Sequence, residues 1–91
     1  MSKRAVWKFT IDPFDTVDIT MPEGSQILTL GVQNQEVQMW ARVDPDARPV
    51  TRRIAIAGTG HTRIDMDGPY LGTVQLLGGS LVFHAFDLGE V

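Results

Sequence analysis

The chain of 91 residues contains no cysteine, so neither a disulfide nor a thiolate metal site can stabilise it. A domain of this size buries only about 60–65% of its unfolded surface and is marginally stable as a monomer. We therefore expect residues 1–91 to form a single domain that assembles as a homo-oligomer. The lack of cysteine also fits a cytoplasmic protein.

Long hydrophobic runs and blocks of basic residues are missing as well. No apolar run approaches the roughly 20 residues that a membrane helix needs, and the segment after MSKR alternates polar and apolar residues, unlike a signal peptide. The net charge is −3, and no Lys/Arg block is long enough to follow a phosphate backbone. These absences argue against a membrane partner and against general nucleic-acid binding.

The sequence also carries no recognisable catalytic or metal-binding pattern. Ser25 and Ser80 lie outside any nucleophile motif, and Asp65 and Asp67 are explained as turn residues. The two histidines are not spaced as metal ligands are. We predict no catalytic residue, no metal and no cofactor, and we favour a protein that is not an enzyme.

What the sequence does contain is a series of short strands separated by turn residues. No segment shows helical periodicity over ten or more residues, and 44–50 allows one helical turn at most. Trp7 is predicted to face the core, and the tail 87–91 to fray. This pattern predicts an all-β domain of about seven antiparallel strands, either a sandwich or a small barrel. The predicted strands are 6–11, 16–21, 26–32, 37–43, 51–57 and the two arms of 70–86.

Two pairs of turn residues predict hairpins. Asn34 and Gln35 set Val32 beside Val37 and Leu30 beside Met39. Gly78 and Gly79 suit a type I′ turn, which demands positive φ at both central positions. The register that follows gives this second hairpin an apolar core face and a mixed outer face. The core-face pairs are Leu76–Leu81, Val74–Phe83 and Gly72–Ala85, and the outer pairs are Gln75–Val82, Thr73–His84 and Leu71–Phe86.

The loop GTGHTRIDMDGP, residues 58–69, is the most unusual stretch of the chain. The backbone amides of Gly58, Thr59, Gly60 and His61 are able to form a concave anion site. Arg63 and the nearby Arg53 would supply charge to it. The same glycines also suit a plain tight connection, and the neighbouring aspartates favour surface salt bridges for the arginines. The loop lacks the Gly-Lys-Ser/Thr of a phosphate-binding P-loop.

Two aromatic residues are candidates for stacking on a ligand ring, Trp40 and Tyr70. Trp40 is predicted to lie off the core face beside Gln38 and Arg42. There it would stack on a ligand, pack in a second core layer or contact another subunit. The outer face of the last hairpin is a further candidate interface, formed by Leu71, Val82, His84 and Phe86.

Several segments in order along the chain, VWKF, MPEG, WARVDP, GTGH, YLGTVQ and GGSLVFH, resemble a family of small uncharacterised proteins of tailed phages and prophages. The resemblance extends from Val6 to Phe86. It implies an all-β domain made in the cytoplasm of an infected bacterium, with a role in host takeover or immune evasion through binding. It implies no activity and no catalytic residues.

Two hypotheses of function follow. The first is a sponge that sequesters a small anionic, nucleotide-like ligand with the loop at Gly58–His61, the arginines Arg53 and Arg63, and an aromatic ring of Trp40 or Tyr70. The second is a protein-interaction or virion-associated structural protein with no small-molecule ligand. It needs only Leu71, Val82 and Phe86 as an interface, and its partner would be a host protein.

Overall fold

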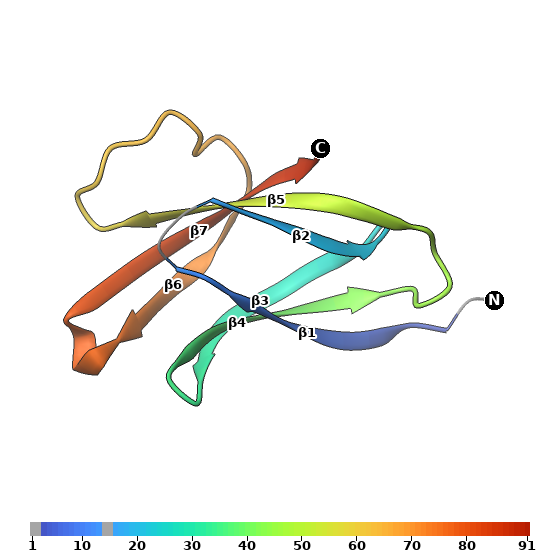
Figure 1. Cartoon of the computed structure of the whole chain (residues 1–91), viewed down its shortest axis with the longest axis horizontal. Helices are drawn as coiled ribbons and strands as arrows, with labels where there is room; N and C mark the ends of the chain where they lie inside the picture. The colour runs from blue at the N-terminus through green and yellow to red at the C-terminus, as the bar shows by residue number, and fades with distance from the viewer. Residues whose placement is uncertain (1–2, 14–15) are drawn as a thin grey trace.

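The computed structural model describes residues 3–13 and 16–91, and these form two antiparallel sheets (Figure 1). A three-stranded sheet has the order β1-β4-β3, and a four-stranded sheet has the order β2-β5-β7-β6. The prediction of a single all-β fold of seven antiparallel strands is therefore confirmed, and its form is an open sandwich. The strands are β1 (Ala5–Ile11), β2 (Val17–Pro22), β3 (Gln26–Gln33), β4 (Glu36–Val43), β5 (Pro49–Gly58), β6 (Tyr70–Leu76) and β7 (Leu81–Glu90).

The core lies between the two sheets and follows from the alternation of apolar residues along the strands. In β4 the predicted inward residues Val37, Met39, Ala41 and Val43 are buried. β5, the neighbour of β2 and β7, contributes buried apolar residues from Ile54 to Ala57. No helix in the described ranges is long and apolar enough to span a membrane.

Both predicted hairpins form, because their turn residues adopt the required positive φ. Asn34 and Gln35 have φ values of 54° and 64°, and the predicted pairs Val32–Val37 and Leu30–Met39 are present. Gly78 and Gly79 have φ values of 67° and 96°. The Ser80 amide donates to the Leu77 carbonyl at 3.2 Å, which closes the second turn. Local turn chemistry therefore sets the register of both hairpins.

One predicted pair of the second hairpin is wrong. A register shift between Tyr70 and Gly72 places Tyr70, not Leu71, opposite Phe86. Leu71 is the extra residue of this bulge, and it packs against the core instead of joining the outer face. The remaining predicted pairs of the hairpin are found.

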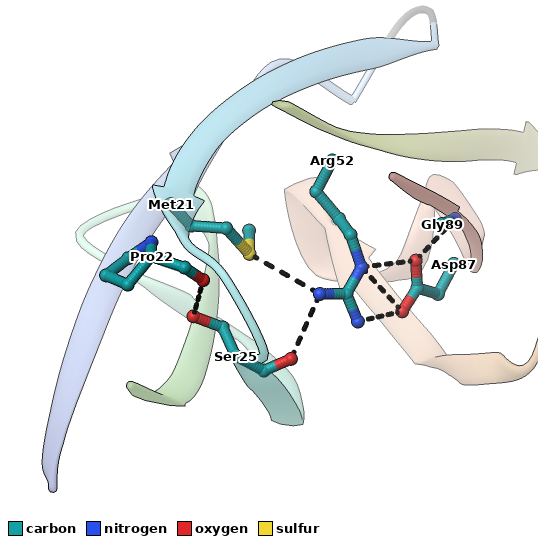
Figure 2. A network of polar contacts seen from close by, with 6 residues as sticks. All are labelled: Met21, Pro22, Ser25, Arg52, Asp87 and Gly89. Atoms are coloured by element: carbon teal, nitrogen blue, oxygen red, sulfur yellow. Dashed lines mark hydrogen bonds and ion pairs between the residues drawn. The ribbon is translucent and has the colours of Figure 1, made fainter. Parts of the chain in front are cut away.

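The prediction that the tail frays is also wrong, because β7 continues to Glu90. Figure 2 shows the polar contacts of Asp87 and Gly89 near this end. Asp87 is buried, and both of its carboxylate oxygens contact Arg52 of β5, with the Nη2–Oδ2 distance at 2.7 Å. Arg52 Nη1 donates to the Ser25 carbonyl at 3.0 Å, and the Gly89 amide donates to Asp87. The network fastens the end of β7 to β5 and to the β2–β3 turn.

Trp7 does not lie in the core as predicted. It is 40% exposed, although it shares a face with the buried Ile11. β1 is an edge strand, so one flank of Trp7 has no neighbouring strand to cover it. The alternation therefore predicts the correct side of the strand but not the depth of burial.

Candidate functional site

The two arginines predicted to bind an anion are already engaged by carboxylates. Arg63 contacts both oxygens of Asp65, at 2.7 and 2.8 Å, and also donates to the Ile56 carbonyl. Arg53 contacts both oxygens of Asp18, at 2.8 and 3.0 Å. The hydrogen bond from Arg63 lowers the pKa of Asp65 to about 2, and that from Arg53 lowers the pKa of Asp18. An anionic ligand would have to displace these carboxylates from paired contacts.

In the turn at Gly58–His61, some of the backbone amides predicted to bind an anion already donate to carbonyls of the protein. The His61 amide donates to the Gly58 carbonyl at 3.0 Å, and the Thr59 amide donates to the Val82 carbonyl at 3.3 Å. A Cβ atom on Gly58 would lie 2.8 Å from His61 Nδ1, so the imidazole is folded over this glycine. Gly60 has a φ of 85°, which suits a tight turn. Two of the four amides expected to hold an anion are thus bonded within the protein.

Several other predicted residues meet on the outer face of the four-stranded sheet. Thr59 Oγ1 lies 2.7 Å from His84 Nε2, and His84 Nδ1 lies 3.0 Å from Thr73 Oγ1. Tyr70 contacts Thr73 through its hydroxyl and stacks at a tilt on Phe86, with 5.4 Å between ring centroids. The predicted ligand residue Tyr70 and the predicted interface residues His84 and Phe86 therefore form one row. Its polar atoms hydrogen-bond to one another.

Trp40 belongs to the other sheet, so it does not join the Gly58–His61 turn in one site. It lies on the outer face of β4, opposite Lys8 of β1 and Thr29 of β3. A Cβ atom on Gly31 would lie 3.1 Å from Trp40 Cζ3 and 3.6 Å from Cη2, so the indole leans across onto β3. Gly31 leaves the space that this position of the ring requires. The ring is half-buried and offers the remainder of its surface to solvent.

Two cations flank Trp40, and their partners are neutral. Lys8 Nζ donates to Gln33 Oε1 at 2.7 Å, and Arg42 Nη1 donates to Gln26 Oε1 at 3.0 Å. Among the described residues these two and Lys3 are the only Lys or Arg side chains outside an ion pair with a carboxylate. The paired arginines are Arg4, Arg48, Arg52, Arg53 and Arg63. We call the surface formed by Lys8, Gln26, Gln33, Trp40 and Arg42 the Trp40 face.

Lys8 is a site residue that the sequence reasoning missed. The alternation in β1 does place it on the outer face, opposite to Phe9 and Ile11. Alternation does not specify which strand pairs with β1. Only the structure therefore shows that Lys8 lies beside Trp40. No group of three metal-binding side chains is present in 3–13 and 16–91.

Comparison with known proteins identifies the domain but not its activity. A family model described as a domain of unknown function, DUF7352, matches residues 2–90. No curated protein and no solved structure matches the chain. The resemblance to phage proteins stays a prediction. Because the matched family model spans nearly the entire sequence, the chain belongs to the DUF7352 family.

Proposed function

We propose that this protein is a non-enzymatic binding protein that holds a small, ring-bearing anion, of the nucleotide type, on the Trp40 face. The observation that carries the proposal is that Trp40 lies opposite Lys8 of β1 and two residues from Arg42 on the same strand, and that the partners of both cations are neutral amides. A planar base that stacks on an aromatic side chain gains about 1–3 kcal/mol. The two cations would contact the anionic group.

Electrostatics favour this face over the Gly58–His61 turn. The turn's nearby cations, Arg53 and Arg63, would have to exchange one carboxylate for another anion, with little net gain. Lys8 and Arg42 would exchange a neutral amide oxygen for an anionic one, which strengthens the hydrogen bond. The chain as a whole carries a charge of −3, so a local positive surface is needed to attract an anion.

Binding of this kind acts by stoichiometric sequestration, and no bond of the ligand is broken. It is compatible with the host-takeover or immune-evasion role that the resemblance to phage proteins implies. The alternative function, interaction with a protein partner, would use the outer face of the last hairpin, where Val82, His84 and Phe86 remain after Leu71 has turned to the core.

Tryptophan fluorescence tests the proposal. The chain has two tryptophans, so Trp7→Phe leaves Trp40 as the sole reporter. In this background we expect ATP to quench the emission more strongly than uncharged adenosine, because stacking alone leaves the cations unused. A short oligoadenylate is the second probe. Tighter binding of the oligoadenylate than of ATP would indicate a single-stranded nucleic acid as the ligand, and tighter binding of ATP would indicate a free nucleotide. Lys8→Gln and Arg42→Gln should each weaken ATP binding by about 3- to 10-fold.

Arg53→Gln is the matched control, since it removes the same charge from the opposite sheet. It should leave ATP binding unchanged. Equal binding of adenosine and ATP would contradict the proposal. The proposal would also be contradicted if Arg53→Gln lost ATP binding while Lys8→Gln and Arg42→Gln kept it. That result would place the site at the Gly58–His61 turn instead.

A further inference from the structure

An open groove lies between the tips of the two hairpins, β3–β4 and β6–β7, which point toward the same end of the molecule (Figure 1). Its volume is about 760 Å³, a size typical of sites for small molecules or a few side chains. Ile11 and Val37, buried members of the core, form part of the lining. The other apolar lining residues are Pro13, Val32, Leu76, Leu77 and Leu81.

Leu77 on the lip of this groove is both exposed and conformationally unfavourable. It is 72% exposed, and its φ is 52°, in the left-handed region that disfavours a residue with a Cβ atom. The connection between the paired residues Leu76 and Leu81 includes a short 3-10 turn, Leu77–Gly79, in which all three residues have positive φ and the other two are glycines. A glycine or asparagine at 77 would suit the backbone better, so the leucine is not explained by the hairpin. Unfavourable backbone conformations of this kind concentrate at functional positions.

The charged residues that line the groove indicate which charge its occupant would carry. Two carboxylates, Asp12 and Glu36, lie among the lining residues, and the described lining includes no Lys or Arg. Glu36 is exposed and takes part in no ion pair within the described part of the chain. An occupant with apolar side chains beside a cation would match both the walls and the rim.

We propose that this groove binds an extended segment of a partner protein, in which one or two large apolar side chains are flanked by Lys or Arg. A second copy of the chain fits less well, since a symmetric contact would bring two Glu36 carboxylates together. The groove shares no residue with the Trp40 face. The proposal therefore stands or fails independently of the nucleotide-like ligand.

Selection from a random library of displayed 12-residue peptides on the immobilised protein tests the inference. We expect enriched peptides to combine large apolar residues with adjacent Lys or Arg, and to bind in solution. Glu36→Gln should weaken an enriched peptide about 3-fold, because the rim charge is lost. Leu77→Ser, a change at an exposed position, should weaken it about 10-fold or more. Asp46→Asn, which removes one charge from the exposed 44–48 loop at the other end of β4, is the matched control and should have no effect.

Three results would overturn the proposal. One is a library with no enriched peptide, and another is a set of enriched peptides that bind Leu77→Ser as tightly as the unchanged protein. The third is a dimer in sedimentation velocity that Leu77→Ser converts to a monomer, which would assign the groove to a second copy. Thermal melting of each variant verifies that the fold is intact.

Discussion

Gly31 is the residue on which the position of Trp40 depends. The nearest indole carbon would lie only 3.1 Å from a Cβ atom at this position, which is closer than carbon atoms pack comfortably. Glycine in the interior of a strand is otherwise unfavourable by about 0.5–1 kcal/mol relative to alanine. Glycine at this position therefore lowers the stability of the strand slightly but leaves room for the indole to lean over β3.

Gly31→Ala should accordingly separate stability from binding. The alanine favours the strand but pushes the ring outward by a few tenths of an ångström, so we expect a change in stability within about 1 kcal/mol. Emission of Trp40 in the Trp7→Phe background should shift to longer wavelength, and the affinity for ATP should fall. Unchanged emission together with unchanged affinity would show that the ring does not depend on Gly31.

At the scale of the strands, the Arg52–Asp87 pair joins the end of β7, the last strand, to β5. The side chains of Arg52 and Asp87 are only 17% and 11% exposed, and they join β5 to the end of β7 (Figure 2). Asp87→Asn would leave the guanidinium partly buried without an opposite charge. We expect it to lower the free energy of unfolding by about 2–3 kcal/mol.

Asp18→Asn is the matched control for this prediction. It makes the same substitution in the Arg53–Asp18 pair, whose side chains are each 44% exposed. Water screens such a pair and replaces the lost contact, so the loss of stability should be much smaller. Urea unfolding of both variants measures the difference. Equal losses would mean that burial does not distinguish the two ion pairs.

The elements that could be predicted from the sequence are those fixed by neighbours in the chain. Asn34 and Gln35 or Gly78 and Gly79 determine a hairpin locally, because the turn dictates the register on both sides. Alternation also predicts which side of a strand faces inward. Neither signal states which distant strands pair, and so Lys8 beside Trp40, Asp87 beside Arg52 and the groove between the hairpin tips could not be predicted.

For the whole molecule, the internal ion pairs determine where charge remains available. Five arginines are bound by aspartate or glutamate. Among the described residues, Lys8 and Arg42 lie on the outer face of one sheet outside any ion pair, and the exposed carboxylate of Glu36 lies at the groove. Under the two proposals, the cations of the Trp40 face would attract an anion with a ring, and the carboxylate of Glu36 at the groove would attract a basic, apolar segment.

The same ion pairs make the stability of the fold depend on acid. The hydrogen bond from Arg63 lowers the pKa of Asp65 to about 2, and that from Arg53 lowers the pKa of Asp18. Burial of Asp87 alone would raise its pKa, but the hydrogen bonds from Arg52 and Gly89 and the charge of Arg52 outweigh burial and lower it. Each carboxylate thus binds its proton less readily in the folded chain than in the unfolded one.

A carboxyl whose pKa is lower in the folded state contributes stability above the unfolded pKa, about 3.9 for aspartate, and loses it as the pH falls through the folded value. Asp18, Asp65 and Asp87 should therefore leave Tm nearly constant from pH 7 to 5 and lower it between about pH 4 and pH 2. Scanning calorimetry across this range measures the effect. Asp87→Asn should begin from a lower Tm and lose less of it on acidification, because one of the titrating groups is gone. A Tm that rises below pH 4, or an equal fall in the variant, would contradict this account of the ion pairs.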